Sequence, residues 1–392
     1  REFIMKDAYT FDRDMEGLDA HYEDYRKAYH RVFERCGLDF YECASDVGMM
    51  GGTGAHEFMA PCAAGENDVA LGADGYAANV EVATADPQPV PPLQLDGRLE
   101  TPTQTTIEAV AGHLGIHPGN TLKAFPVVTE SRGLVMVFVR GDHRINDVKL
   151  RNHLREDFRP AREEELPGPA GFLGPSAEVQ AIVDPAVGEG PWVAGANEAG
   201  WHEVVRELPG ERADIRTVEA GDLRGGSPIR VGLLALRAAA PLGATYLDEH
   251  GKEQLIVMGS YGIGPARIAA SAVEQYADDR GIAWPKAIAP FDVEVVALGK
   301  PGSQEAAAAE VLYKDLRTAG LDALLDDRSG GAGEKLTDAE LLGAPLRLVV
   351  GKRSAESGAA EAQLRRGRQD VEGGVPLREA AERVRELWPT IA

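Results

Sequence analysis

The chain has 392 residues, enough for two or three domains, and 41 Lys and Arg against 63 Asp and Glu give it a net charge of −22. Apolar residues make up 44% and charged residues 27%, a globular mixture that excludes global disorder. Three cysteines without a CxxC spacing exclude a disulfide framework and disfavour a zinc site, so we expect a reducing, cytoplasmic setting and no metal-ligating cluster. No apolar run approaches the length of a membrane span. A chain this acidic is expected to bind nucleic acid only where basic residues form a local cluster.

The first part of the chain predicts a strand, a helix and a glycine-rich turn. Residues 1–11 alternate apolar and polar side chains, which is typical of a strand. Residues 16–36 place apolar side chains at steps of three and four, which predicts an amphipathic helix that ends at Gly37. The segment GMMGGTGAHEF predicts a turn into a short strand, and four prolines within 85–95 predict an extended linker.

A second unit follows this linker. Helical patterns cover 106–114 and 143–154, and strand patterns cover 121–128 and 134–140. Loops rich in Gly and Pro continue to about residue 222, after which strand sequence resumes. We therefore predict an α+β domain inserted into another domain.

The last part of the chain alternates strands and helices. LIVMGSYGIGPAR runs from a strand through a glycine turn into a helix. Beyond Pro290, strands are expected in FDVEVVAL, DALLDD and PLRLVVGK, and helices in 304–319, 334–342 and 377–387. This alternation predicts a small α/β domain with a mostly parallel sheet.

These segments together carry a family resemblance. REFIMKDAYTF resembles the second half of the motif 2 hairpin of class II aminoacyl-tRNA synthetases, and MGSYGIGPAR resembles their motif 3. With GGTGAHEF, WPKAIAPFDV and the segment from DDRSGG to VVGKR, the set resembles the bacterial-type prolyl-tRNA synthetases. LKAFPVV, VRGDHRINDVKL, FLGPSA and GANEAGWHEV are similar to the editing domain inserted in that family.

The resemblance implies a multidomain α+β and α/β fold. Residues 1–94 and 223–289 would form an incomplete catalytic domain on the class II antiparallel sheet, 95–222 the inserted α+β editing domain, and 290–392 the α/β anticodon-binding domain. It also implies ATP-dependent ligation of L-proline to its tRNA through prolyl-adenylate, with ATP and Mg²⁺. Hydrolytic editing of mischarged alanyl-tRNA and a homodimer in the full-length protein are implied as well.

Motif 3 carries the candidate ATP residues that have a physical rationale of their own. Adenylation requires ATP to be held with its phosphates neutralised. Gly262 and Gly264 allow a sharp turn and close approach to a ligand, and Arg267 can fork two phosphate oxygens from the first turn of its helix. On spacing alone, a tight turn with a surface arginine explains the pattern equally well.

The remaining adenylation candidates rest on the resemblance. Phe3 would stack on adenine and Glu2 would meet the base edge, while Asp7 would pair with the imino group of proline. Alternation places Phe3, Met5, Asp7 and Tyr9 on one face of the strand. An ordinary edge strand with aromatic core residues is the alternative, and it suffices for Phe11. The proline-pocket candidates are Asp7, Tyr9, His56, Glu57 and Ser260.

The editing-pocket candidates also follow from the resemblance. Lys123 would neutralise the terminal phosphates or the developing oxyanion, Gly174 and Pro175 would position the ester, His202 would exclude proline by size, and Asp184 would be a pocket partner. Without the resemblance, a lone strand lysine is usually a solvated charge. A further group is expected to form a structural turn into a helix: Gly141, Asp142, His143 and Asn146.

The C-terminal part contains the basic cluster. Between Gly343 and Arg368, two acids face six basic residues, a local charge of +4: Arg347, Lys352, Arg353, Arg365, Arg366 and Arg368. Such a cluster can meet anticodon-stem phosphates, and a short helix beginning near Glu334 can reach base edges; for any single arginine, a solvated surface is the simpler explanation. The tRNA-binding candidates are Glu334, Lys335, Arg347, Lys352 and Arg353.

Two departures from the family leave alternatives open. The sequence begins at Arg1 within motif 2, without motif 1 or the first motif 2 strand, so we expect little adenylation from this chain in isolation. In addition, LLALRAAA at 233–240 replaces polar residues that line the family's ATP and proline pockets. A freestanding alanyl-tRNA deacylase and a noncatalytic tRNA-binding fragment are therefore the alternatives to a ligase.

Overall fold

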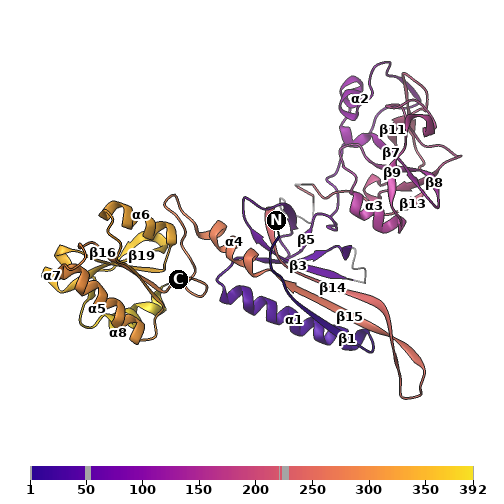
Figure 1. Cartoon of the computed structure of the whole chain (residues 1–392). Coiled ribbons are helices and arrows are strands. Elements are labelled where there is room, and N and C mark those ends of the chain that lie inside the picture. The colour runs from indigo at the N-terminus through magenta and orange to yellow at the C-terminus, as the bar shows by residue number, and fades with distance from the viewer. Residues whose placement is uncertain (1, 49–53, 220, 223–228, 392) are drawn as a thin grey trace. The chain divides into compact units, whose positions relative to one another are not determined.

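A computed structural model describes residues 2–48, 54–219, 221–222 and 229–391 (Figure 1). The chain divides into two compact units, one of residues 1–41, 58–66 and 231–392, the other of 42–57 and 67–230. The second unit thus joins the expected insertion to 67–94, which the sequence placed in the catalytic domain. The glycine-rich turn expected near 48–54 falls largely outside the described residues. Within the described part, no helix is long and apolar enough to cross a membrane.

The first unit contains the two motif-bearing strands and the helix between them. Strand β1 pairs antiparallel with β15, and β15 also pairs antiparallel with β14, which extends through the altered stretch 233–240. Helix α1 contributes Tyr29 and Phe33 to a core that also contains Phe58 and Tyr261. The elements are β1 (Lys6–Asp12), α1 (Met15–Arg35), β14 (Ile229–Leu247), β15 (Glu253–Ile263) and α4 (Pro265–Tyr276).

Two expectations for the first strand are corrected. The strand begins at Lys6, so of the four residues expected on one face Phe3 and Met5 lie outside the strand, and Asp7 and Tyr9 remain on its outer face together with Phe11. Phe11 was assigned to the core, but its side chain is 62% exposed. The reason is the period of two: Asp12 is buried, so the alternate position, Phe11, points outward.

The second unit begins with short strands. Strands β4 and β5 pair antiparallel, and Ala44 of β2 bridges to Ala78 of β5. Val218 joins Ala70, Ala78 and Ala83 in a small core beneath them. The bounds are β2 (Tyr41–Ser45), β3 (Ala55–Pro61, which spans both units), β4 (Asn67–Leu71) and β5 (Ala77–Asn79).

The insertion is built on two sheets. One has the order β13-β10-β8-β7-β9, and the other has the order β11-β12-β6. The expected helix at 143–154 begins only at Asp147, because Asn146 is its N-cap and accepts hydrogen bonds from the first turn. The elements are β6 (Arg98–Glu100), α2 (Ile107–Leu114), β7 (Leu122–Thr129), β8 (Gly133–Arg140), α3 (Asp147–Leu154), β9 (Phe158–Pro160), β10 (Gln180–Val183), β11 (Trp192–Gly195), β12 (Trp201–Val205) and β13 (Glu211–Arg212).

The proline-rich segment 80–91 is held against the insertion by side chains. Lys149 Nζ donates to the carbonyl of Ala83 at 2.5 Å and forms an ion pair with Asp214 at 2.9 Å. Four further side chains bind carbonyl oxygens of this segment: Asn146 at Val80, Arg216 at Ala85, Arg140 at Gln88 and Asn120 at Pro91. After a turn at 80–82 the segment forms no helix or strand, and these bonds explain why it belongs to the same compact unit as the insertion.

The C-terminal domain is the α/β fold that the sequence predicts (Figure 1, yellow). Strands β17, β16 and β18 are parallel, whereas β19 and β20 continue the sheet antiparallel. Helices α5 and α8 cover one apolar face and α6 packs on the other. The bounds are β16 (Val293–Ala297), α5 (Gln304–Thr318), β17 (Ala323–Asp326), α6 (Ala332–Leu342), β18 (Leu346–Val350), α7 (Lys352–Ser357), β19 (Ala359–Leu364), β20 (Gln369–Asp370), β21 (Val375–Pro376) and α8 (Ala380–Leu387).

The buried ammonium of Lys149 gives a stability prediction. Lys149→Met keeps the apolar stem but leaves the oxygens of Ala83 and Asp214 without their donor, so the free energy of unfolding should fall by about 2–3 kcal/mol. Urea unfolding followed by tryptophan fluorescence measures this change. Arg144→Met is the control, because the Arg144 side chain is 71% exposed in its pair with Glu219 and should contribute less than about 1 kcal/mol. Equal losses in the two variants would contradict the role given to Lys149.

Candidate functional site

A cavity of about 430 Å³ in the insertion brings two predicted residues together. Lys123 enters it from β7 and His202 from β12. The other walls come from the start of α2, from β7, from the 171–173 loop and from the end of β11: Thr105, Thr106, Ile107, Glu108, Val110, Leu122, Ala124, Gly171, Leu173 and Gly195. An ammonium, two hydroxyls and an imidazole therefore share one pocket of small-ligand size.

The ammonium of Lys123 is fixed by a turn of the chain. Its Nζ donates to the carbonyl oxygen of His143 at 2.6 Å. The turn is held because Arg140 binds Asp142 through two nitrogens, at 2.7 and 3.0 Å. A Cβ at Gly141 would lie 2.0 Å from Thr121 Oγ1, so only glycine fits there. Together with the cap at Asn146, these contacts make the Gly141–Asn146 segment structural, as the sequence suggested.

His202 is buried beside the cavity and bound by a residue that the sequence did not single out. The Oγ1 atom of Thr101 lies 2.7 Å from its Nδ1, and the Phe172 ring is 5.5 Å away. Burial lowers the pKa of His202, which favours the neutral ring at neutral pH. A neutral ring fixed in this way acts as a wall of the pocket rather than as a second cation.

Gly174 and Pro175 lie behind the cavity wall. Asn197 bridges them: its Oδ1 accepts from the Gly174 amide at 3.0 Å and its Nδ2 donates to the Pro175 carbonyl at 3.1 Å. A Cβ at Gly174 would come within 1.8 Å of the Gly195 oxygen, and Gly195 lines the cavity. These residues thus shape the wall from behind.

Asp184 does not join Lys123 and His202. It is 1% exposed, and its oxygens accept from the backbone amides of Ala186, Ile215 and Arg216 at 2.8–3.0 Å. It lines a different cavity. The expectation that Asp184 is a pocket partner is therefore corrected: its carboxylate is used to organise the backbone.

The motif 2 and motif 3 segments meet in the first unit. The guanidinium of Arg267, on the first turn of α4, lies over the Phe3 ring with its Cζ 4.5 Å from the centroid. A Cβ at Gly264 would touch Phe3 and Met5 at 3.3 Å, so this glycine permits the close approach. Gly262 was expected to form a sharp turn, but it lies within strand β15, paired with Asp7.

The proline-pocket candidates are distributed over both units. Tyr9 of β1 lies opposite Ser260 of β15 in the antiparallel register, and Asp7 is exposed on the same strand. His56 and Glu57 lie on β3 in the second unit, where Glu57 Oε2 accepts from Asn79 at 3.1 Å. Glu2 is exposed.

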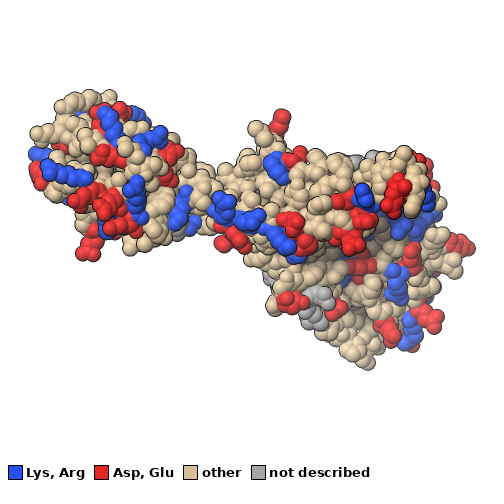
Figure 2. Space-filling view, turned by 90° about the horizontal axis from the view of Figure 1, so that it is seen from below, with Lys and Arg blue, Asp and Glu red and all other residues tan. Residues whose placement is uncertain are grey.

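Several basic side chains of the C-terminal cluster are buried or paired with acidic residues in the structure. Lys335 is 1% exposed and donates to the carbonyls of Ala297 and Asp326, so it is no tRNA contact; this expectation is corrected. Arg365 is buried and binds Asp278 through two nitrogens. Arg347 is mostly covered, near Glu340 at 3.6 Å. On the face of this domain visible in Figure 2, basic and acidic side chains are interspersed.

Three of the tRNA candidates keep accessible side chains. Lys352 and Arg353 are exposed at the start of α7, and Glu334 is exposed in the first turn of α6. Among the described residues, there is no group of three or more His, Cys, Asp or Glu that could hold a metal ion. A magnesium ion bound mainly by phosphates needs only one or two carboxylates from the protein, so Glu57 fits such a role chemically.

Comparison with known proteins identifies the class. A family model described as "Aminoacyl-tRNA editing domain" matches residues 101–208, which contain Lys123 and His202. A model described as "Anticodon binding domain" matches residues 292–387. The chain thus combines an aminoacyl-tRNA editing domain with an anticodon-binding domain, as expected from the resemblance.

Curated relatives give the particular family. A proline–tRNA ligase of Heliobacterium modesticaldum is 44% identical over 397 residues, which cover 94% of this chain and 68% of the relative. That of Halothermothrix orenii is 40% identical over 422 residues, covering 100% and 73%. The chain belongs to the proline–tRNA ligase family.

A solved structure is also similar, at a lower level. The prolyl-tRNA synthetase of Cryptosporidium parvum, described as a complex with L-proline and AMP, is 22% identical over 41% of this chain and 35% of its own, with a TM-score of 0.37. At this score the likeness is too slight to support an argument about the fold.

Several residues at or beside the cavities were not predicted from the sequence. Thr101 and Thr105 carry no signal in a single sequence, since threonines before a helix are ordinary capping residues. Glu294 does carry a signal: it is the one carboxylate of the otherwise apolar strand Val293–Ala297, and it is 1% exposed. A charge at the centre of a buried parallel strand is unusual.

His143 gives a pH prediction. Burial lowers its pKa from 6.5 to about 4, with the nearby Arg140 adding to the shift. Between these two pH values the unfolded chain binds more protons at His143 than the folded chain does. The free energy of unfolding is therefore not reduced by His143 above pH 6.5, and it decreases as the pH falls toward 4.

Replacement of His143 tests this linkage. In His143→Gln, the loss of unfolding free energy between about pH 6.5 and 4.5 should shrink by roughly 1–2 kcal/mol, measured by urea unfolding at each pH. His250→Gln is the control, since the His250 side chain is 82% exposed. If the two variants have the same pH slope as the parent, His143 is not the titrating group.

Proposed function

We propose that this chain contributes to the two activities of its family, ligation of proline to its tRNA and hydrolysis of mischarged alanyl-tRNA, with adenylation expected only in the active enzyme and little of it from this chain in isolation. The contact between Arg267 and Phe3 carries the ligase proposal. These residues are far apart in sequence, yet the guanidinium of Arg267 lies over the Phe3 ring at the motif 3 turn.

This stack suits a purine nucleotide. A flat base stacks on Phe3, and the planar, permanently charged guanidinium of Arg267 can stack on the base or bind phosphate oxygens. Tyr9, Ser260 and Asp7 follow along the same strand pair and are the proposed contacts of proline, where the Asp7 carboxylate would meet the imino group. Gly262, Gly264 and Glu2 are proposed to shape the nucleotide pocket.

Other parts of the proposal rest on family membership. His56 and Glu57 are proposed at the proline pocket, with Glu57 as a carboxylate available to a phosphate-bound Mg²⁺. Lys352, Arg353 and Glu334 are proposed tRNA contacts. Homodimerisation and a cytoplasmic location are proposed for the protein in which this chain functions.

Replacement of Arg267 tests the ligase proposal. In the active enzyme, Arg267→Ala should lower the rate of proline-dependent exchange of pyrophosphate into ATP by about 100-fold, the scale for loss of one charged transition-state contact. Arg280→Ala, an exposed arginine beyond α4, is the matched control and should exchange at the parent rate. A loss of less than threefold in Arg267→Ala would remove this residue from the site.

The pocket of Lys123 and His202 supports the editing proposal. Hydrolysis of an aminoacyl ester needs a bound tRNA 3′ end, a water near the carbonyl and a cation or donors for the oxyanion. Lys123 supplies the cation, held in place by the His143 carbonyl. The wall that contains His202 limits the size of the amino acid, which admits alanine and disfavours proline.

Two variants separate charge from size. Lys123→Ala should abolish deacylation of alanyl-tRNA because the cation is lost, whereas His202→Ala should keep activity and raise the relative rate on prolyl-tRNA. The discrimination by size is finite, about 10–200-fold. Release of labelled amino acid from the two aminoacyl-tRNAs measures both rates.

Arg151→Ala is the control for this experiment, because Arg151 is a half-exposed arginine of α3 away from the cavity. If Lys123→Ala deacylates alanyl-tRNA at the parent rate, Lys123 is not the catalytic cation of the editing pocket. A parent chain that deacylates neither substrate would leave the noncatalytic tRNA-binding alternative.

A further inference from the structure

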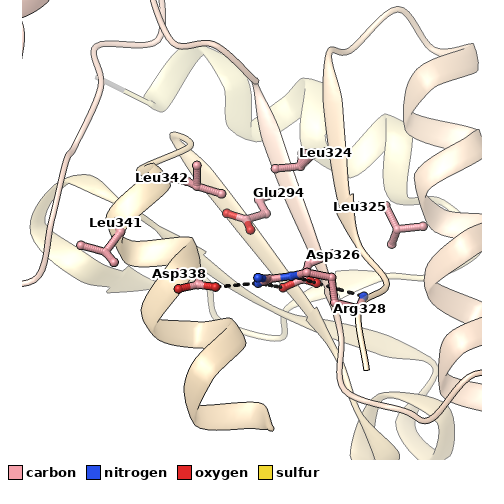
Figure 3. Close-up of a pocket in the computed structure, with 8 residues that line it drawn as sticks. All are labelled: Glu294, Leu324, Leu325, Asp326, Arg328, Asp338, Leu341 and Leu342. Carbon is pink, nitrogen blue, oxygen red and sulfur yellow. Dashed lines mark hydrogen bonds and ion pairs between the residues drawn. The ribbon is translucent and has the colours of Figure 1, made fainter. Parts of the chain in front are cut away.

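A second cavity lies in the C-terminal domain, between α6 and the sheet. Its volume is about 420 Å³, within the roughly 300–1,000 Å³ range of small-molecule sites. Four leucines supply apolar walls and four charged residues supply polar groups (Figure 3): Leu324, Leu325, Leu341, Leu342, Glu294, Asp326, Arg328 and Asp338.

Glu294 is the unexplained group in this cavity. It comes from strand β16, which lies between β17 and β18, and points toward the space between Leu342 and Arg328 in Figure 3. The residue is 1% exposed, and its Oε2 atom has no hydrogen-bond partner among the described residues. Burial, and secondarily Asp326, raise the pKa of this carboxyl to about 7. A buried carboxyl without a donor is costly, and a bound donor would remove that cost.

The other charged groups of the cavity already satisfy one another. Arg328 binds Asp326 through Nε at 3.0 Å and Nη2 at 2.8 Å, and the same Nη2 binds Asp338 at 2.7 Å. Arg347 lies opposite Glu294 on the neighbouring strand β18, and its charge acts to lower the pKa of Glu294. Its Nη2 donates to Gln363 at 2.7 Å, its Nη1 lies 3.6 Å from Glu340, and its buried Nε has no hydrogen-bond partner among the described residues. With Glu294 ionised, three carboxylates and one guanidinium line the cavity, an excess of negative charge.

This chemistry selects the ligand. The carboxyl of Glu294 requires N–H donors, the excess charge favours a cation, and the leucines favour an apolar or flat body. An amidinium or guanidinium meets a carboxylate through two parallel hydrogen bonds, which is the strongest such pairing. We propose that this cavity is a binding site for a small organic cation of the amidine or guanidine class, with Glu294 as its partner.

A nucleobase of tRNA is the competing occupant in an anticodon-binding domain. The charge of the cavity argues against it. Phosphates attached to the base would approach three carboxylates, and the guanidinium of Arg328, which is the only one among the described lining residues, is already paired. The proposed site is therefore independent of the ligase and editing proposals, and its test does not depend on either activity.

Binding of benzamidine to the full chain tests the proposal, measured by calorimetry at about pH 8, where Glu294 is mostly ionised. Benzamide is the matched neutral probe, with the same shape and no charge. We expect benzamidine to bind at least about tenfold more tightly than benzamide. Glu294→Gln should weaken benzamidine by at least about tenfold and remove the preference between the two probes.

A second pair of variants leaves Glu294 intact. Leu341→Arg places a guanidinium at the cavity mouth on a residue that is 52% exposed, so it should fold and compete with benzamidine. Val311→Arg is its control, with the same charge added on α5 at a residue 56% exposed. Three outcomes would each overturn the proposal. The first is equal affinity for benzamidine and benzamide, and the second is unchanged benzamidine binding in both Glu294→Gln and Leu341→Arg. The third is tighter binding of cytidine or guanosine than of benzamidine.

Discussion

The editing half of this molecule depends on buried cations that bind backbone carbonyl oxygens. The segment 80–91 is rich in proline and forms no strand, so its carbonyl groups need donors from elsewhere. Lys149 supplies one to Ala83, and its charge is balanced by Asp214 at 2.9 Å. Burial lowers the pKa of Lys149, while Asp214 acts in the opposite direction and favours the charged form. Without these bonds from side chains to its carbonyl oxygens, the segment would be a flexible linker. Because of them, it is part of the compact unit.

Bonds between cations and carbonyl oxygens also connect this segment to the candidate editing pocket. Arg140 binds the carbonyl of Gln88 at 2.6 Å and clamps Asp142, which fixes the turn that presents the carbonyl of His143. That carbonyl holds the ammonium of Lys123 at 2.6 Å. A lysine without this bond would sample many rotamers, so the bond reduces the conformational entropy that is lost when a substrate binds. The low pKa of His143 keeps a second positive charge away from the ammonium.

Periodicity and turn residues predicted most of the fold, because they report local backbone preference. The helix expected over 16–36 and the alternating elements of the C-terminal domain are confirmed with small shifts of their ends. Predictions that concern single charged or aromatic side chains were less successful, since those depend on partners far away in sequence. Lys335 was expected at the surface, yet carbonyls of β16 and β17 bind it in the core. The editing candidates came from family resemblance, and no local pattern distinguishes Lys123 from a solvated lysine or Asp184 from a pocket residue.

Lys335 of α6 and Glu294 of β16 provide the sharpest contrast within the C-terminal domain. Both are 1% exposed, but Lys335 donates to two carbonyl oxygens and lies 3.8 Å from Asp326, so its burial is compensated. Glu294 has an orphaned oxygen, and a leucine or methionine at its place would fill the same strand position without that cost. A contribution to the stability of the fold therefore explains the buried lysine at position 335, but it does not explain the buried glutamate at position 294. A side chain that lowers stability and opens onto a cavity is characteristic of a binding site, where the missing partner is supplied by a ligand rather than by the fold.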